Sequence, residues 1–190
     1  MNTDDLIYVV QNQLEKDFCE HVIEKFKKDD NKSQGLTLGG IDLNAKQSMD
    51  LEISDREDWK EEDEVFYKSL TNNIHEYRDW VPSPYEDYVF DRKIEDTGYQ
   101  IQETQPGGFY TWHHDGLSSR ILTFIWYLND ISEGGHTEFN TGFKIQPEIG
   151  KFVMFPGLWP WVHRGVSPKS EVKYLCTGWV IEKPMGVDKT

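Results

Sequence analysis

The chain has 190 residues, enough for one domain with a sizeable hydrophobic core. Its formal net charge of −14 argues against binding to nucleic acid or to an anionic membrane surface, because both need clustered Lys and Arg. No apolar run approaches the roughly 20 residues of a membrane span, and the N-terminal residues lack the basic start and apolar stretch of a signal peptide. Cys19 and Cys176 show no zinc-type spacing and are interpreted as reduced core thiols, so we expect a cytoplasmic protein.

The first half of the chain predicts two helices. Residues 5–10 predict a short strand, and apolar residues at helical spacing then predict a helix at about 16–28, with Asp17 as its N-cap. Residues 29–57 are polar and glycine-containing and predict a loop with room for one short strand. A second helix is predicted at about 58–79. Its inner face is expected to carry Trp59, Val65, Phe66, Leu70, Ile74 and Tyr77.

The second half changes to short strands separated by turn residues. Seven strands at this spacing favour a barrel or a sandwich. We therefore expect a mainly β single domain over 1–190, with helical support from about 1–85 and a β core over about 86–182. The predicted strands are 97–104, 109–113, 120–128, 136–139, 151–155, 160–164 and 172–181.

Three residues of this half form a candidate metal site. His113 and Asp115 are two apart, so their side chains point the same way on extended backbone, and His163 follows in a later strand. Two imidazoles and one carboxylate are the ligands of a non-haem Fe(II) facial triad. A His-x-Asp pair alone is weak evidence, because the chain has six histidines. The alternative is that His113 caps a turn and that His163 is a hydrogen-bonded core residue.

The residues around this triad resemble one family over most of 97–182. That family is the Fe(II)- and 2-oxoglutarate-dependent dioxygenases, and the resemblance is to its prolyl 4-hydroxylase-like branch. Five segments occur in the family's order and spacing. They are GGFYTWHHD at 107–115, RILTFIWYLN at 120–129, EGGHTEF at 133–139, GKFVMF at 150–155, and HRGV at 163–166 with KYLCTGW at 173–179.

The resemblance implies a double-stranded β-helix, also called a jelly-roll, with supporting helices. It implies Fe(II) as the metal, held by the catalytic ligands His113, Asp115 and His163, and 2-oxoglutarate and O2 as co-substrates. Lys173 matches the residue that pairs with the distal carboxylate of 2-oxoglutarate. The other matching residues are Tyr127 and Thr177 beside that carboxylate, and Tyr110 and Trp179 near the substrate, where ordinary core packing is an equal alternative.

The resemblance also implies an activity: hydroxylation of prolyl residues in a protein or peptide, with ascorbate (vitamin C) as a further candidate requirement. Two alternatives stay open, namely the same chemistry on another side chain or on a free small molecule, and a non-catalytic β-helix binding module that keeps its metal. The second is disfavoured, because such a module need not retain the triad together with Lys173.

One departure concerns the substrate side of the site. Members of this branch often carry a Tyr shortly before the Gly-Gly pair, whereas residues 102–106 of this chain contain none. Either Gln102 or Thr104 replaces its hydrogen bond, or the pocket differs there. The polar segment 29–57 is predicted to be the lid. His114 and His136 are expected to lie outside the metal site. Arg120 and Arg164 are expected to be either substrate contacts or members of surface ion pairs.

Overall fold

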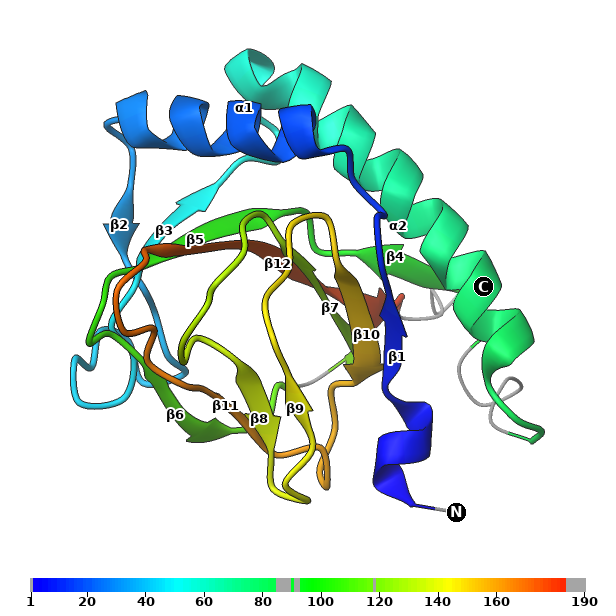
Figure 1. Ribbon diagram of the computed structural model, residues 1–190. Helices are drawn as coiled ribbons and strands as arrows, with labels where there is room; N and C mark the ends of the chain where they lie inside the picture. Colours follow the sequence, from blue (N-terminus) through cyan, green and yellow to red (C-terminus); the bar gives the residue numbers. More distant parts are fainter. Residues whose placement is uncertain (1, 85–89, 91–92, 118, 184–190) are drawn as a thin grey trace, which may run out of the picture.

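The computed structural model describes residues 2–84, 90, 93–117 and 119–183. These residues form a large and a small β-sheet that face each other, and helices α1 and α2 cover the outer face of the large sheet (Figure 1). The expected jelly-roll with supporting helices is confirmed. None of the described helices has the length and apolar character that crossing a bilayer would require.

The two predicted helices are confirmed, with corrections at their ends. Helix α1 runs over Lys16–Lys28 and α2 over Lys60–Trp80, and the short 3-10 helix η2 (Glu57–Trp59) leads into α2. The N-cap position of α1 is Glu15, so the prediction of Asp17 was wrong; Asp17 lies in the first helical turn, where an acidic side chain suits the helix dipole. Val65 was wrongly placed on the inner face of α2, because it is exposed.

The large sheet has eight strands among the described residues, and every pairing is antiparallel. Its order is β1-β10-β7-β12-β5-β3-β2, with β4 paired to β12. The predicted strand at 5–10 is shorter than expected, because its first residues form the 3-10 helix η1 (Thr3–Leu6). The strands are β1 (Tyr8–Val10), β2 (Ser33–Gln34), β3 (Met49–Glu52), β4 (Ile94–Asp96), β5 (Gln100–Thr104), β7 (Arg120–Tyr127), β10 (Phe152–Pro156) and β12 (Lys173–Glu182).

The small sheet consists, in the described part of the chain, of four short antiparallel strands in the order β6-β11-β8-β9. They are β6 (Tyr110–His113), β8 (Thr137–Phe139), β9 (Lys144–Ile145) and β11 (His163–Gly165). The predicted strand at 160–164 therefore begins later than expected, and β9 was not predicted.

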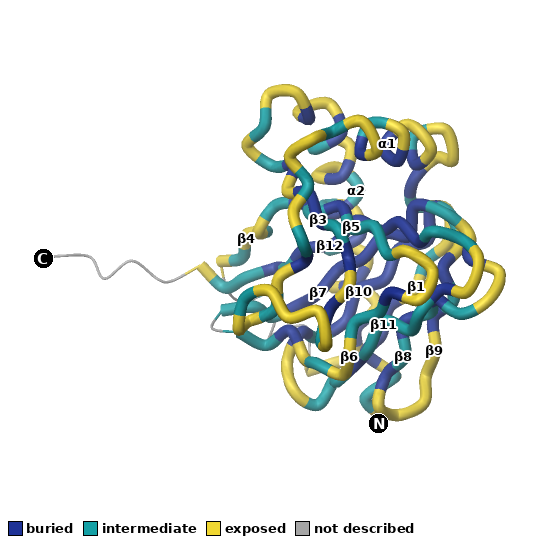
Figure 2. Tube along the Cα trace, turned by 90° about the vertical axis from the view of Figure 1, so that its left-hand side faces the viewer, coloured by how far each residue is buried: buried dark blue, intermediate teal, exposed yellow. Residues whose placement is uncertain are grey.

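The main hydrophobic core lies between the helices and the large sheet. Phe66 of α2 is fully buried, with its ring 5.3 Å from that of Trp126 in β7 and 5.6 Å from that of Tyr99. Figure 2 shows buried segments through β7, β10 and β12 and exposed segments mainly in the loops. The inner face of the large sheet looks toward the small sheet, and the functional side chains gather in the space between them.

Candidate active site

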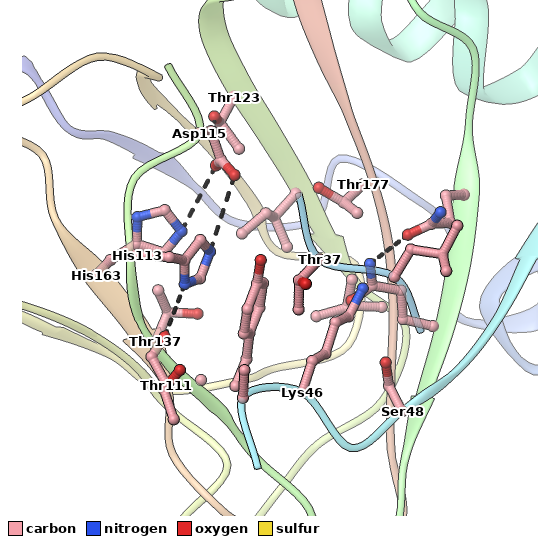
Figure 3. Close-up of a pocket in the computed structure, with 18 of the residues that line it drawn as sticks. Thr37, Lys46, Ser48, Thr111, His113, Asp115, Thr123, Thr137, His163 and Thr177 are labelled. Carbon is pink, nitrogen blue, oxygen red and sulfur yellow. Dashed lines mark hydrogen bonds and ion pairs between the residues drawn. The ribbon is translucent and has the colours of Figure 1, made fainter. Parts of the chain in front are cut away.

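The structure brings the three candidate metal ligands together. His113 ends β6 and His163 begins β11, where the two residues lie directly opposite each other in the antiparallel pair. Asp115 follows β6 in a loop. Its Oδ1 lies 3.8 Å from Nε2 of His113, and its Oδ2 lies 3.6 Å from Nε2 of His163 (Figure 3). The three ligand atoms all lie within 4.8 Å of one another, which suits convergence on one ion.

A hydrogen bond orients each of these side chains. Nδ1 of His113 donates to the backbone carbonyl of Thr111 at 2.8 Å, and Nδ1 of His163 donates to that of Trp161 at 3.1 Å. Since a carbonyl only accepts, both hydrogens sit on Nδ1, and each Nε2 keeps its lone pair for a metal. The hydroxyl of Thr123 donates to Oδ2 of Asp115 at 2.8 Å.

Burial and neighbouring groups favour the metal-binding forms of His113 and Asp115. Burial, followed by the proximity of His163, lowers the pKa of His113 and favours its neutral form. Burial opposes ionisation of Asp115, but His163, His113 and the Thr123 hydroxyl together outweigh it and hold the pKa of that carboxyl below its ordinary value. Neutral imidazoles beside an ionised carboxylate are the forms that bind a divalent cation.

The triad opens into a cavity of about 490 Å³ between the two sheets. Lys173 lines it and is only 4% exposed. Its Nζ donates to the carbonyl of Gly135 at 2.8 Å, and no described carboxylate forms an ion pair with it. Burial lowers the pKa of Lys173 to about 8. A buried ammonium without a counter-ion is costly, so this end of the cavity suits an anionic ligand.

Alternate residues of β12 face the cavity, as expected for a strand with one inward face. Thr177 is among them, and its hydroxyl donates to the carbonyl of Phe124 at 2.7 Å. Tyr127 is placed differently, because it is fully buried and does not line the cavity. Its hydroxyl is hydrogen-bonded to that of Thr137 at 2.6 Å, and Thr137 does line the cavity.

The two residues expected near the substrate both line the cavity. The ring of Tyr110 stacks on the imidazole of His113 with centroids 3.6 Å apart. Trp179 lies under the guanidinium of Arg120, whose Cζ is 3.5 Å from the ring centroid. Arg120 also lines the cavity and has no ion pair among the described residues. Arg164, in contrast, pairs with Glu138 at 2.6 Å, as one of the two interpretations expected.

Sequence reasoning missed one wall of the cavity. Segment 36–48, within the predicted lid, contributes Lys46 and Ser48 to the lining (Figure 3). Nζ of Lys46 lies 2.6 Å from Oδ2 of Asp50, and the Ser48 hydroxyl donates to Oδ1 of the same carboxylate at 2.7 Å. The available signal was the polar residues at alternate positions from Lys46 to Glu52, but a two-residue period in a polar segment does not distinguish a buried wall from a solvated strand.

The structure also places the two residues, Gln102 and Thr104, that were expected to replace the hydrogen bond of the Tyr absent before Gly107. Thr104 lies directly opposite Lys173 in the β5–β12 pair, and both Thr104 and Gln102 line the cavity. His114 is exposed and does not belong to the cluster of candidate metal ligands. His136 does not line the cavity.

Comparisons with known proteins agree with the motifs. Residues 99–181 match the model of the 2OG-Fe(II) oxygenase superfamily, which confirms the resemblance. No curated protein matches the chain.

Several solved structures are similar. A viral collagen prolyl hydroxylase from Paramecium Bursaria Chlorella virus-1, solved with 2OG, has a TM-score of 0.70 and 21% identity over 94% of this chain and 97% of its own. A Trichoplax adhaerens prolyl hydroxylase, solved with a hypoxia inducible factor peptide fragment, has a TM-score of 0.74 and 18% identity over 94% and 84%. A Pseudomonas putida prolyl-4-hydroxylase has a TM-score of 0.71 and 18% identity over 95% and 97%. At these identities the similarity shows the fold.

Proposed function

We propose that the chain, whose residues 99–181 match the 2OG-Fe(II) oxygenase superfamily, is an Fe(II)- and 2-oxoglutarate-dependent dioxygenase that hydroxylates prolyl residues in a protein or peptide. The observation that carries this proposal is the presence, in one cavity, of the His113–Asp115–His163 cluster and the buried ammonium of Lys173, which forms no ion pair with any described residue. In this proposal the whole chain works as one domain.

The three ligands fit a divalent cation that must keep coordination positions open. Their donor set is two imidazoles and one carboxylate, and all three residues line the cavity. Fe(II) bound there, with 2-oxoglutarate and O2 as co-substrates, would supply the oxidising chemistry that protein side chains lack. The contribution of the chain is to hold the ligands, to place the co-substrate and to exclude bulk water.

Lys173 fits the distal carboxylate of 2-oxoglutarate. Its ammonium is fixed by the Gly135 carbonyl at the buried end of the cavity, so a bound carboxylate would provide its missing counter-ion. A compact ammonium binds one carboxylate as a point charge, whereas Arg would require space for a planar fork. The proposed polar neighbours of this carboxylate are Thr177, four residues along the same inward face, and Thr137, whose hydroxyl is hydrogen-bonded to that of Tyr127.

The cavity mouth supports a peptide as the substrate. Leu36 and Leu38 line one side and are 61% and 72% exposed, and Tyr110 and Trp179 offer aromatic surface next to the triad. Exposed apolar residues beside a polar cavity are typical of a binding surface. A proline-containing segment is already stiff, so docking it on this surface costs less conformational entropy than docking a flexible chain. The exposed part of segment 36–48, which precedes the buried Lys46, is the proposed lid.

The test is turnover with defined peptides. The enzyme is incubated with Fe(II), 2-oxoglutarate and ascorbate, and with proline-containing peptides or their proline-to-alanine counterparts. We expect faster succinate release with the proline set, and peptide products heavier by one oxygen atom that contain hydroxyproline. Leaving out ascorbate tests that requirement separately.

Other outcomes would redirect the proposal. One observation favours a substrate other than a prolyl residue: Thr104 lies opposite Lys173, and residues 102–106 lack the Tyr that prolyl hydroxylases of this branch often have. If succinate forms without any preference for proline, the iron chemistry stands and another side chain or a free small molecule becomes the substrate. If metal binds but 2-oxoglutarate is never consumed, the chain is a non-catalytic binding module.

A further inference from the structure

The three candidate metal ligands differ in how they are oriented. His113 and His163 are each oriented by a backbone carbonyl, of Thr111 and of Trp161. Asp115 is oriented by a side chain, the hydroxyl of Thr123, which donates to Oδ2 at 2.8 Å. Partners of this kind set the orientation and the basicity of metal ligands. Thr123 is thus the one orienting hydroxyl that a substitution can remove while leaving the ligand itself intact.

Asp115 depends on such a partner more than the histidines do. His113 and His163 belong to paired strands, whereas Asp115 lies in the loop after β6. Its backbone carbonyl accepts a hydrogen bond from the Leu117 amide at 2.8 Å, which shapes a turn but does not fix the carboxylate. An aspartate carboxylate rotates over a broad range unless something holds it.

Thr123 is well placed to hold the carboxylate. It lies in β7 at the centre of the large sheet, opposite Trp179 of β12, and is buried. Gly157 packs against the contact: a Cβ there would lie 3.2 Å from Oγ1 of Thr123 and 3.6 Å from Cβ of Asp115. The hydroxyl therefore links a loop residue to a buried position of the large sheet. The motif RILTFIWYLN includes this Thr, and the proposed function gives it no role.

We propose that Thr123 is a positioning residue for the metal centre. By donating to Oδ2, its hydroxyl sets the orientation of the Asp115 carboxylate and disfavours chelation through both oxygens, which would take up a coordination position that the co-substrates need. The inference rests on the metal centre of the proposed function. Thr123 lines the cavity, and in this assignment it acts through Asp115 and not as a ligand of the metal.

The test measures metal binding rather than turnover. The metal-free full chain and its Thr123→Val and Thr123→Ser variants are titrated with Co(II) alone, by calorimetry and by the visible spectrum of the bound ion. Val keeps the shape of Thr but removes the hydroxyl, whereas Ser keeps the hydroxyl. We expect about 10–100-fold weaker Co(II) binding and an altered spectrum for Thr123→Val, the range typical of losing such a partner. For Thr123→Ser we expect near wild-type binding and spectrum.

Ser54→Ala is the control. Ser54 is half-buried, and its hydroxyl donates at 2.6 Å to the carboxylate of Asp63, which lies outside the cavity. The variant also loses a hydroxyl that donates to a carboxylate, and it is expected to lower the melting temperature while leaving Co(II) affinity unchanged. If Thr123→Val does not fold by circular dichroism, Thr123→Ala is measured in its place.

Three results would overturn the inference. Wild-type affinity and spectrum in Thr123→Val would mean that the hydroxyl only satisfies its own burial. An equal loss in Thr123→Ser would assign the effect to the methyl group. A wild-type chain that fails to bind Co(II) would remove the proposed metal centre itself, so the two failures are distinguishable.

Discussion

The two sheets contribute differently to this molecule. In the large sheet, β7 and β12 are eight and ten residues long, and helices cover the outer face. In the small sheet no described strand exceeds four residues, yet it supplies both histidines of the triad. The comparison teaches that stability and metal ligation are largely separated, because most of the buried apolar side chains pack on the large sheet, whereas the small sheet has the two histidine ligands.

Each sheet nevertheless depends on the other. The histidines of the small sheet are held by backbone carbonyls and by rings such as that of Phe139 in β8, whose centroid is 5.6 Å from that of His163. The large sheet provides the two side chains that complete the site, Lys173 and Thr123. A mutation in either sheet should therefore have a recognisable signature, and the following experiments test that division.

The largest effect is expected from His163→Ala in the small sheet. Without this imidazole the cluster loses one of its ligands, so succinate formation and Co(II) binding should both disappear. Saturating Co(II) at 100 times its Kd should stabilise the wild type by about 2.7 kcal/mol and leave the variant unchanged. Thermal melts with and without Co(II) measure this difference. A variant that is stabilised as strongly as the wild type would mean that His163 is not a ligand.

Phe66→Ala tests the large sheet and its helix layer. The ring is fully buried against Tyr99 and Trp126, so its removal should cost about 3–5 kcal/mol of unfolding free energy. Tyr67→Ala, at the exposed next position of α2, should change it by less than about 0.5 kcal/mol. Urea denaturation measures both. If the fraction of Phe66→Ala that remains folded bound Co(II) much more weakly, the separation of stability from ligation would not hold.

Lys173→Ala should act on the co-substrate alone. Losing a charge-assisted bond of about 1.5–3 kcal/mol and leaving the carboxylate unpaired should raise the KM for 2-oxoglutarate about 10–1000-fold. Lys173→Arg should recover part of this loss, because the charge returns with a different shape. Lys169→Ala, which removes an exposed lysine nearby in the sequence, is the control. An unchanged KM in Lys173→Ala would transfer the role to another cation of the cavity, such as Arg120.

The same lysine predicts a pH dependence. Burial lowers the pKa of Lys173 to about 8, and only the protonated form carries the charge that binds a carboxylate. As pH rises through this value, kcat/KM for 2-oxoglutarate should fall, approaching about tenfold per pH unit. Lys173→Arg stays charged throughout, so its profile should lack this decline. Identical alkaline profiles for the two enzymes would assign the decline to another group.

The smallest effect is expected at the cavity mouth. Leu38→Ser should raise the KM for a proline-containing peptide by about two- to tenfold, since partly burying such a side chain is worth about 0.4–1.4 kcal/mol. The KM for 2-oxoglutarate should not change. Val65→Ser, at an exposed position of α2, is the matched control. Equal effects of the two substitutions on the peptide KM would argue against a role for segment 36–48 in peptide binding.

Local sequence patterns determined the main elements and the identity of the metal-site residues. Helices α1 and α2 have an apolar period of 3.6 over several turns, and β12 places Lys173 and Thr177 on one face through its two-residue period. These signals are local, because each depends on residues a few positions apart. The triad residues were identified by their chemistry and by the motifs around them.

The tertiary structure alone decided what lies around those residues. β2 and β9 have two residues each, too few for any period, and they are strands only because a partner strand supplies their hydrogen bonds. The wall at Lys46 and the Thr123–Asp115 contact likewise depend on where loops lie in space. Chain order does not encode such placements locally, because each one follows from packing between distant segments.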